Sequence, residues 1–518
     1  MNNNNMPALI RTLIIYAVCV PLAVWIGFML ADPFDVSTFS YAGIMALVLC
    51  TPLLLRWHHF LLIATWNLGM TIFFLPGHPP IWLLMAAMSL GFSLLQRMIN
   101  DRAHFLSAPS ITWPLIFLVA VVLFTAKLTG GIGLHSLGDE TAGGKNYFLL
   151  LMGIMGYFAL TAQQIPPKRV GLYISLFFLA GCTAFIGDLA PFLPSPLYFL
   201  FLLFPVNSMD LSLMSQGTLT HDVVRFIGIG WAGEAGFLFM LACYGPRGLF
   251  LSGRLWRPVL FVLFTGLSLL GGFRSQIILC GFVFLFQFFL EGVHRTKVFP
   301  VFIMAGVIAI TLLVPFASKL PFTFQRSLAF LPLKLNAAAR SDAEDTEDWR
   351  LQIWKDALPT VPQYLLLGKG YAISHGDLAV ASNQAFHYAS DIESVDIVGN
   401  YHSGPLSVVI PFGIWGVIGI LWFWGASLRA LYFNYRYGDP VVRTVNIFLL
   451  AFFIARILVF LIIFGGLYGD MYYFTSIIGL SISINGGIRR PAAAPVRAAE
   501  KNSAAPPVRP HLQPFYPG

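Results

Sequence analysis

The chain has 518 residues, of which 57% are hydrophobic and 10% are charged, and its formal net charge is +8. A soluble domain usually carries about 25% charged residues, so this composition excludes an ordinary soluble fold. Apolar stretches of about 20 residues recur along the chain, and each is long enough to cross a hydrocarbon core of about 30 Å. The composition therefore predicts an all-α polytopic membrane protein.

The apolar stretches predict fourteen spans, and about 12–14 transmembrane helices are expected in all. The first stretch, Ala8–Leu30, is too long for the apolar region of a signal peptide, so we expect it to stay in the mature protein. The predicted spans are 10–30, 39–55, 60–75, 80–96, 111–128, 146–162, 170–189, 224–243, 257–273, 276–291, 298–317, 402–424, 445–464 and 471–486.

One further apolar stretch, Pro196–Val206, has about half the length of a span. We interpret it as re-entrant or interfacial, because irregular backbone at membrane depth has to be shielded by protein. A full span here would move several basic connections to the opposite side of the membrane.

The basic connections should share the cytoplasmic side. With the predicted spans they do, which places both termini in the cytoplasm and residues 318–400 on the outer face. These connections carry Arg56, Arg97, Arg102, Lys168, Arg169, Arg247, Arg254, Arg257, Arg295, Lys297, Arg429, Arg436, Arg443, Arg489, Arg490 and Arg497.

The chain accordingly divides into five parts. They are N-terminal transmembrane helices over 1–255, transmembrane helices with a turn at Arg274 over 256–317, a large outer loop over 318–400, C-terminal transmembrane helices over 401–488, and a disordered basic cytoplasmic tail over 489–518. None of the five cysteines has a CxxC partner, so neither a disulfide framework nor a zinc site is indicated.

The outer loop is the polar part of the chain. It carries Asp342, Glu344, Asp345, Glu347, Asp348, Arg350, Lys355 and Lys369. A protein that only conducts or flips a solute has little need for such a charged segment, whereas an enzyme at the membrane surface does.

Arg274 stands in a tight turn between two spans, Gly271–Gln276, on the outer face. A guanidinium there can bind an anion in a bidentate manner that suits phosphate. The alternative is an interfacial arginine that extends to lipid headgroups.

Arg350 follows a segment that reads as the start of a helix. Thr346 is the expected N-cap, acidic residues fill the first turn, and Pro359 lies beyond the end. Arg350 and Trp354 are four residues apart and share a face. The alternative is a helix that lies along the interface, with its tryptophans as membrane anchors.

His402 opens the span after the outer loop. A helix N-terminus disfavours imidazolium, and a neutral imidazole can accept a proton from a hydroxyl group as a general base. The alternative is a hydrogen-bonding interfacial histidine.

Three more charged residues fall in predicted spans: Asp188, Glu234 and Arg456. Ionisable residues at membrane depth are costly and indicate function by default. Glu234 and Arg456, both expected mid-span, either pair with each other for stability or guide a polar substrate.

These sites together resemble the O-antigen ligase and O-antigen polymerase superfamily, over about 258–425. The family's turn between two late spans corresponds to Phe273-Arg274-Ser275, with Phe in place of a small residue. Its loop arginine before an aromatic corresponds to Arg350 and Trp354. Its remaining motifs correspond to Leu367-Gly368-Lys369-Gly370-Tyr371, His402-Ser403 and Phe412-Gly413-Ile414-Trp415-Gly416.

The resemblance implies a multi-pass protein of the bacterial inner membrane with a periplasmic active site. It implies transfer of a glycan from an undecaprenyl-diphosphate-linked donor to a lipid or glycan acceptor, by a metal-independent inverting reaction with no cofactor. Arg274 and Arg350 would hold the diphosphate and His402 would act near the acceptor hydroxyl. We expect membrane lipids and no nucleic acid among its partners.

Other residues on the outer face are candidates to line the sugar path: Tyr371, Tyr401, Asp391, Glu393 and Asp396. Polymerases of the superfamily often show an Arg-x10-Gly pattern in outer loops, which residues 318–400 lack; Arg225 and Gly236 fit the spacing, but Gly236 falls inside a span. This favours a ligase over a polymerase. The remaining alternatives are a polysaccharide or lipid transporter and a scaffold for envelope assembly.

Overall fold

The structure is a computed structural model. It describes residues 36–75, 77–100, 105–131, 141–206, 225–297, 299–374, 399 and 401–491, together with a few isolated positions between 16 and 27. The predicted span 10–30 and the predicted tail 489–518 lie almost wholly outside the described residues.

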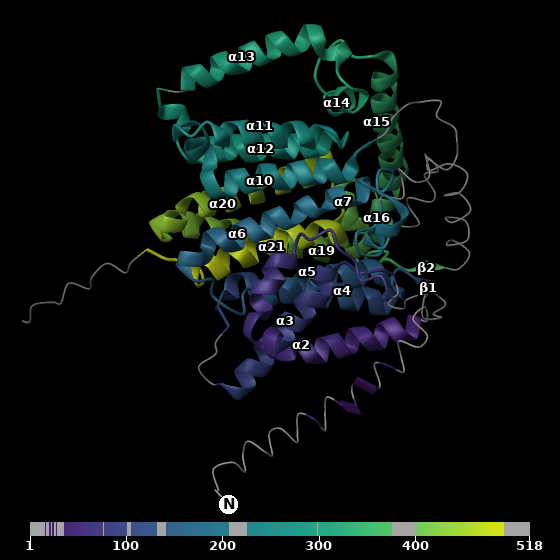
Figure 1. Ribbon diagram of the computed structural model, residues 1–518. Helices are drawn as coiled ribbons and strands as arrows, with labels where there is room; N and C mark the ends of the chain where they lie inside the picture. The colour runs from purple at the N-terminus through teal and green to yellow at the C-terminus, as the bar shows by residue number, and fades with distance from the viewer. Residues whose placement is uncertain are drawn as a thin grey trace, which may run out of the picture.

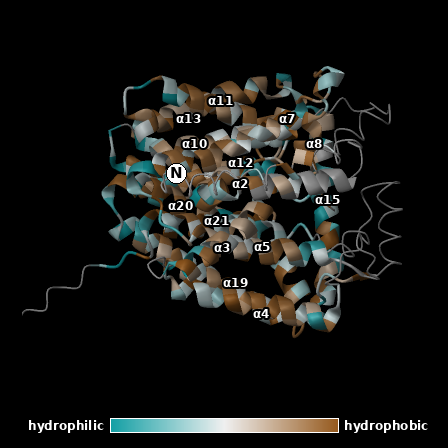
Figure 2. Ribbon diagram, turned by 60° about the horizontal axis from the view of Figure 1, so that its bottom comes forward, coloured by the Kyte–Doolittle hydropathy of each residue, from teal (hydrophilic) through white to brown (hydrophobic). Residues whose placement is uncertain are grey.

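The described chain is a stack of long, roughly parallel helices (Figure 1). Within the described residues, seven helical segments are long and apolar enough to cross a membrane, which confirms an all-α polytopic membrane protein. They are Ile81–Ile99, Pro109–Thr129, Pro167–Asp188, Ile227–Phe250, Phe299–Lys319, Gly404–Tyr437 and Pro440–Ile463. Figure 2 shows hydrophobic residues along the stacked helices and hydrophilic residues gathered at their ends.

The helices of the stack follow the predicted spans closely. Their bounds are α2 Val36–Thr65, α3 Ile81–Ile99, α4 Pro109–Thr129, α5 Gly144–Leu160, α6 Val170–Leu179, α7 Phe185–Asp188, α10 Ile227–Phe250, α11 Trp256–Leu269, α12 Arg274–Leu290, α13 Phe299–Phe316, α19 Gly404–Tyr437, α20 Arg443–Leu458 and α21 Leu467–Asn485. The core lies around α21, where nearly every residue is buried, and Figure 1 shows this helix in the middle of the stack.

The two predicted spans 39–55 and 60–75 are wrong as separate elements. One helix, α2, runs from Val36 to Thr65 with Pro52 inside it. The expected connection around Arg56 stays helical because no glycine or proline interrupts the chain between Leu53 and Thr65. His58 and His59 are buried there and paired, with the Ser89 hydroxyl at 2.9 Å and the Leu160 carbonyl at 2.9 Å.

The segment Pro196–Val206 does not form a span. It holds a short 3-10 helix at Ser195–Leu197 and a four-residue helix, α8, at Leu200–Leu203. The Leu203 carbonyl accepts a hydrogen bond from the Thr71 amide at 2.7 Å, while Tyr198, Phe199 and Leu202 are more than half exposed.

The outer loop covers one end of the stack, which we call the loop end. It contains α14 Phe322–Ser327, α15 Ala337–Ala357, α16 Val361–Tyr364 and strand β2 Ile373–Ser374, which pairs antiparallel with β1 Thr141–Ala142. In Figure 1, α15 runs across the ends of the stacked helices.

The helix that carries Arg350 begins earlier than predicted. Asn336, not Thr346, is the N-cap of α15, and its side chain accepts a hydrogen bond from the Ala338 amide at 3.1 Å. The run Ala337-Ala338-Ala339-Arg340 consists of strong helix formers, so the helix extends ten residues further toward the N-terminus. Its end at Ala357, shortly before Pro359, agrees with the prediction.

The glycine-rich segment after α16 docks on a break in α19. The break lies at Pro411–Gly413, where Gly413 has φ +59°. The amides of Lys369, Gly370 and Ile414 donate to the carbonyls of Ile410, Pro411 and Leu365 at 2.7–3.0 Å. The two motifs therefore form one structural unit that ties the outer loop to α19, the helix that follows His402.

Gly368 is central to this contact because its backbone has φ +77° and a Cβ there would lie 2.1 Å from the Pro411 carbonyl oxygen. We expect Gly368→Ala to destabilise the protein by more than the roughly 1–2 kcal/mol that a left-handed backbone costs an L-residue, measured by thermal unfolding in detergent. Gly266→Ala, inside α11, is the control, because no atom lies within 4 Å of its new Cβ, and it should not destabilise the protein since Ala has the higher helix propensity. Equal melting temperatures for the two variants would contradict this reading.

Candidate functional site at the loop end

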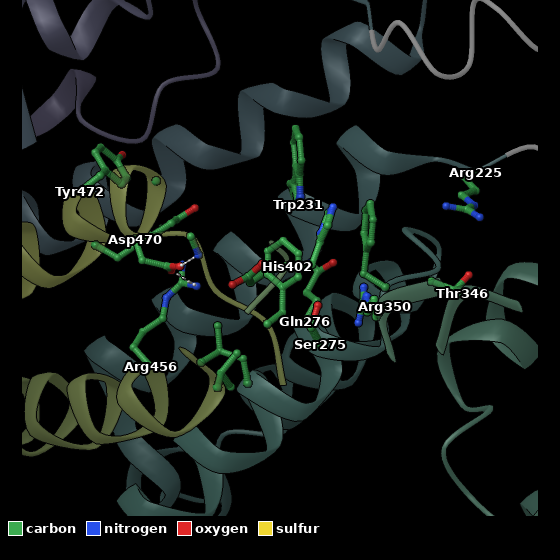
Figure 3. Close-up of a pocket in the computed structure, with 18 of the residues that line it drawn as sticks. Arg225, Trp231, Ser275, Gln276, Thr346, Arg350, His402, Arg456, Asp470 and Tyr472 are labelled. Carbon is green, nitrogen blue, oxygen red and sulfur yellow. Dashed lines mark hydrogen bonds and ion pairs between the residues drawn. The ribbon is translucent and has the colours of Figure 1, made fainter. Parts of the chain in front are cut away.

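A large cavity of about 1040 Å³ opens at the loop end. It lies among the first turns of α10 and α12, the outer-loop helices α14 and α15, and the segments around His402 and Phe464 (Figure 3). Two predicted site residues, Arg350 and His402, line it. Residues more than 200 positions apart in the chain thus meet in one space.

Arg274 lies beside the cavity rather than in its wall. It is the first residue of α12, and its neighbours Phe273 and Ser275 line the cavity. Its guanidinium forms an ion pair with Glu347 and donates to the Ala343 carbonyl at 3.0 Å. Arg274 therefore fastens α15 to the end of α12, and by doing so it positions Arg350.

Arg350 is a half-buried cation that faces the cavity. Its guanidinium carbon lies 5.5 Å from the centre of the Phe464 ring, and its Nε has no hydrogen-bond partner among the described residues. Burial lowers the pKa of Arg350, and the nearby Arg274 and Arg326 lower that pKa further. Like charges gathered this closely favour a bound anion.

Two further arginines, Arg225 and Arg326, line the cavity, and the sequence did not identify them as site residues. Arg326 sits on the short helix α14, is 7% exposed, and donates to the Thr346 hydroxyl at 3.4 Å. Its position in an apolar context, Phe322-Thr323-Phe324-Gln325, was the available signal. Arg225 lies two residues before α10. The only pattern that it fits in the sequence is the Arg-x10-Gly spacing to Gly236.

His402 is held in a strained conformation between two aromatic rings. Its φ is +49°, a left-handed value that costs a non-glycine residue energy and often marks a functional position. The ring centres of Trp349 and Phe464 lie 5.0 and 5.2 Å from that of His402. Its Nδ1 is buried without a hydrogen-bond partner among the described residues.

The imidazole of His402 is neutral near pH 7. Burial, and after it the positive charge of Arg350, together lower the pKa of His402 to about 4. The sequence predicted a neutral ring from the helix N-terminus. The direction agrees, but the main causes are burial and a neighbouring cation.

Trp354 anchors the helix of Arg350 to the segment of His402. Its indole Nε1 donates to the Tyr401 carbonyl at 3.0 Å, and its ring packs against the cluster of Ala357, Tyr401 and Ile410. Trp354 is thus bound to protein, which is the role expected of a scaffold residue and not of a membrane anchor.

The three charged residues predicted inside spans lie near the loop end of their helices. Arg456 is in the last turn of α20, and its Nη1 pairs at 3.6 Å with Asp470, in the first turn of α21. Glu234 lies seven residues after the start of α10, about 10 Å along the axis. Both residues lie inside helical segments that could cross a membrane, Ile227–Phe250 and Pro440–Ile463, and each is seven residues from the loop end of its segment.

Asp188 has a structural role. It ends α7, and its carboxylate accepts hydrogen bonds from the Gly228 and Ile229 amides at 3.1 and 2.7 Å. A carboxylate in this position satisfies the unpaired amides at the start of α10 and opposes the helix dipole.

The candidate sugar-path tyrosines do not line the cavity. Tyr371 and Tyr401 are 4% and 1% exposed. The Tyr371 amide donates to the Tyr147 hydroxyl at 2.8 Å, which joins the glycine-rich segment to α5. The candidate acids Asp391, Glu393 and Asp396 lie outside the described residues.

The fold and this cavity define a multi-pass membrane protein with a cationic site at one end of its helix stack. Residues 258–421 match a family model described as O-antigen ligase, a stretch that contains Arg274, Arg326, Arg350 and His402. The match confirms the resemblance to the O-antigen ligase and polymerase superfamily and supports a ligase or polymerase type of role with lipid-linked glycan substrates. A search of curated proteins found no match.

The low pKa of His402 can be measured directly. The measurement is a magnetic-resonance titration of protein labelled at its histidines, with His402→Gln used to assign the His402 resonance. We expect the ring of His402 to titrate near pH 4, below the ordinary value of about 6.5. Between these two values the unfolded chain binds a proton that the folded chain excludes, so His402 lowers the free energy of unfolding as the pH falls from about 6.5 to 4. A ring that titrates near 6.5 would show that the site is more hydrated than the structure indicates.

Proposed function

We propose that this protein is a membrane glycosyltransferase that moves a glycan from an undecaprenyl-diphosphate-linked donor to an acceptor hydroxyl, in the manner of an O-antigen ligase. The observation that supports it most is the convergence of Arg225, Arg326 and Arg350 with a neutral His402 on one cavity. The site would face the periplasm across the inner membrane of a bacterium.

The chemistry follows from the charges. The acceptor oxygen attacks the anomeric carbon, its proton passes to the His402 imidazole, and the bond from that carbon to the diphosphate oxygen breaks. The electron pair leaves with the polyprenyl diphosphate. Fixed guanidinium groups in a partly dehydrated cavity stabilise this developing negative charge.

We assign Arg274 two effects on the site, one through its contacts and one through its charge. In the structure it holds α15 through Glu347 and the Ala343 carbonyl, so it sets the position of Arg350. Its charge also adds to the positive field at the cavity. We therefore assign Arg350 as the direct diphosphate ligand, with Arg274 as its partner in the clamp.

A ligase is preferred over a polymerase because the outer loop 318–400 lacks the Arg-x10-Gly pattern of many polymerases. A transporter would leave the convergence of His402 and the arginines without a purpose. Transfer of labelled glycan to an added acceptor, in purified membranes, distinguishes an enzyme from a transporter.

Replacement of Arg350 tests the diphosphate clamp. A lysine keeps the charge but loses the planar fork that binds phosphate oxygens in pairs, so we expect Arg350→Lys to reduce transfer by about 10²–10³ and to weaken donor binding. Arg340→Lys is the matched control on the same helix, since Arg340 is exposed and pairs with Glu344 on the surface. Near-normal transfer by Arg350→Lys would rule out the clamp.

Replacement of His402 tests the general base. We expect His402→Ala to slow transfer by about 10²–10⁴ and to leave donor binding largely intact, measured with donor and acceptor in purified membranes. His402→Gln keeps some hydrogen bonding and should also be slow. Full activity of His402→Ala would eliminate the base, and loss of donor binding would assign His402 to the diphosphate site.

A further inference from the structure

We propose that the end of the cavity away from Arg225 and Arg350 is the subsite for the acceptor sugar, the group whose hydroxyl attacks the donor. This inference rests on the proposed function and adds to it a location and a set of residues. The subsite is lined by Glu234, Arg456, Tyr468 and Asp470, with Trp231 and Gln276 next to His402.

The cavity has two ends of different character. Figure 3 places Asp470, Arg456 and Tyr472 on one side of His402, and Arg350, Thr346 and Arg225 on the other. The chain connects them at Phe464, which contacts both the His402 ring and the Arg350 guanidinium and lies six residues before Asp470. A base placed between two polar ends is what a transfer between two bound substrates needs.

The charge balance of this end disfavours a diphosphate. Glu234 and Asp470 face one cation, Arg456, and that cation is already held by Asp470 at 3.6 Å and by the Tyr473 ring, 3.5 Å from its guanidinium carbon. A neutral, hydroxyl-rich group fits such a site, because carboxylates accept hydrogen bonds from hydroxyl groups and a guanidinium donates to them.

Buried polar atoms at this end have no hydrogen-bond partner among the described residues. Gln276 is 6% exposed, and its Nε2 donates to the Gly230 carbonyl at 2.7 Å while its Oε1 has no such partner. The Nε of Arg456 is also buried without a hydrogen-bond partner among the described residues. An unsatisfied buried polar group costs free energy, and both residues line the cavity.

Trp231 supplies an apolar surface next to these polar groups. It precedes Glu234 by one turn of α10, so both project from the same face of the helix into the cavity. The indole is 51% exposed and lines the cavity. An indole face beside a carboxylate can hold the C–H face of a sugar ring while the carboxylate accepts from its hydroxyl groups.

The direction of attack assigns this end to the acceptor and not to the donor glycan. In an inverting displacement the nucleophile approaches the anomeric carbon from the face opposite the leaving group. With the diphosphate held by Arg350, the attacking hydroxyl has to arrive from the other side of the reacting carbon. His402 and, beyond it, Glu234 and Asp470 occupy that side.

The experiment compares acceptor KM with donor binding in purified protein. The probes are a polyprenyl-diphosphate-linked oligosaccharide and a glycolipid that the wild-type protein glycosylates. We expect Glu234→Gln and Trp231→Leu to raise the acceptor KM about 10-fold to 100-fold and to leave donor binding within about twofold of wild type. Trp231→Phe keeps an aromatic face and should show a smaller increase than Trp231→Leu.

The control is Glu291→Gln. Glu291 is also a half-buried carboxylate, but it accepts a hydrogen bond from the Arg247 amide at 2.9 Å, at the end of α12 remote from the cavity. The acceptor KM of the Glu291→Gln variant should equal that of wild type. If Glu234→Gln fails to fold, the two Trp231 variants decide the question, because an exposed ring tolerates replacement.

Two results would overturn the inference while the proposed function stands: an unchanged acceptor KM in the folded Glu234 and Trp231 variants, or donor binding weakened as much as the acceptor KM is raised. Failure of the proposed function looks different. Wild-type protein would then transfer no glycan from the diphosphate-linked donor, and the acceptor subsite would be rejected with it.

Discussion

The site depends on several guanidinium groups that are held close together at the end of an apolar helix stack. Arg274, Arg326 and Arg350 lie near enough that the first two lower the pKa of the third. Such an arrangement repels itself and needs local compensation. Glu347 compensates Arg274 and the Thr346 hydroxyl accepts from Arg326. Arg350 lines the cavity, and its buried Nε has no hydrogen-bond partner among the described residues. Under the proposed function, the diphosphate of the donor would complete this set.

A repulsive cluster persists only where the scaffold fixes it, and here backbone contacts do so. The glycine-rich segment 367–371 hydrogen-bonds to the break in α19, and the Trp354 indole donates to the Tyr401 carbonyl. Together they hold α15 against the start of α19, so Arg350 and His402 face each other across Phe464. The strained backbone of His402, with φ +49°, is the local cost of this placement.

The sequence predicted the parts of this structure that local pattern decides. Apolar length identified the long helices, and the family motifs identified Arg274, Arg350 and His402. It could not show that Arg274 contacts Glu347, because that contact joins residues 73 positions apart. Arg326 escaped notice because a lone arginine in a short apolar segment has no periodic signature, and its role depends on how α14 packs. The start of α15 at Asn336 was missed because acidic residues after Thr346 imitate a first turn, while strong helix formers before it extend the helix.

The neighbourhood of Arg350 and His402 also links the two halves of the proposed reaction. In the free protein the charge of Arg350 helps to lower the pKa of His402 to about 4, which makes the imidazole a weak base. A diphosphate bound at Arg350 would compensate that charge and raise the pKa of His402, so its basicity would increase once the donor is in place. The acceptor hydroxyl would then be deprotonated only beside a bound donor. Under the proposed function, the closeness of Arg350 to His402 thus sets the order of the reaction. The base becomes effective only when the leaving group is already bound.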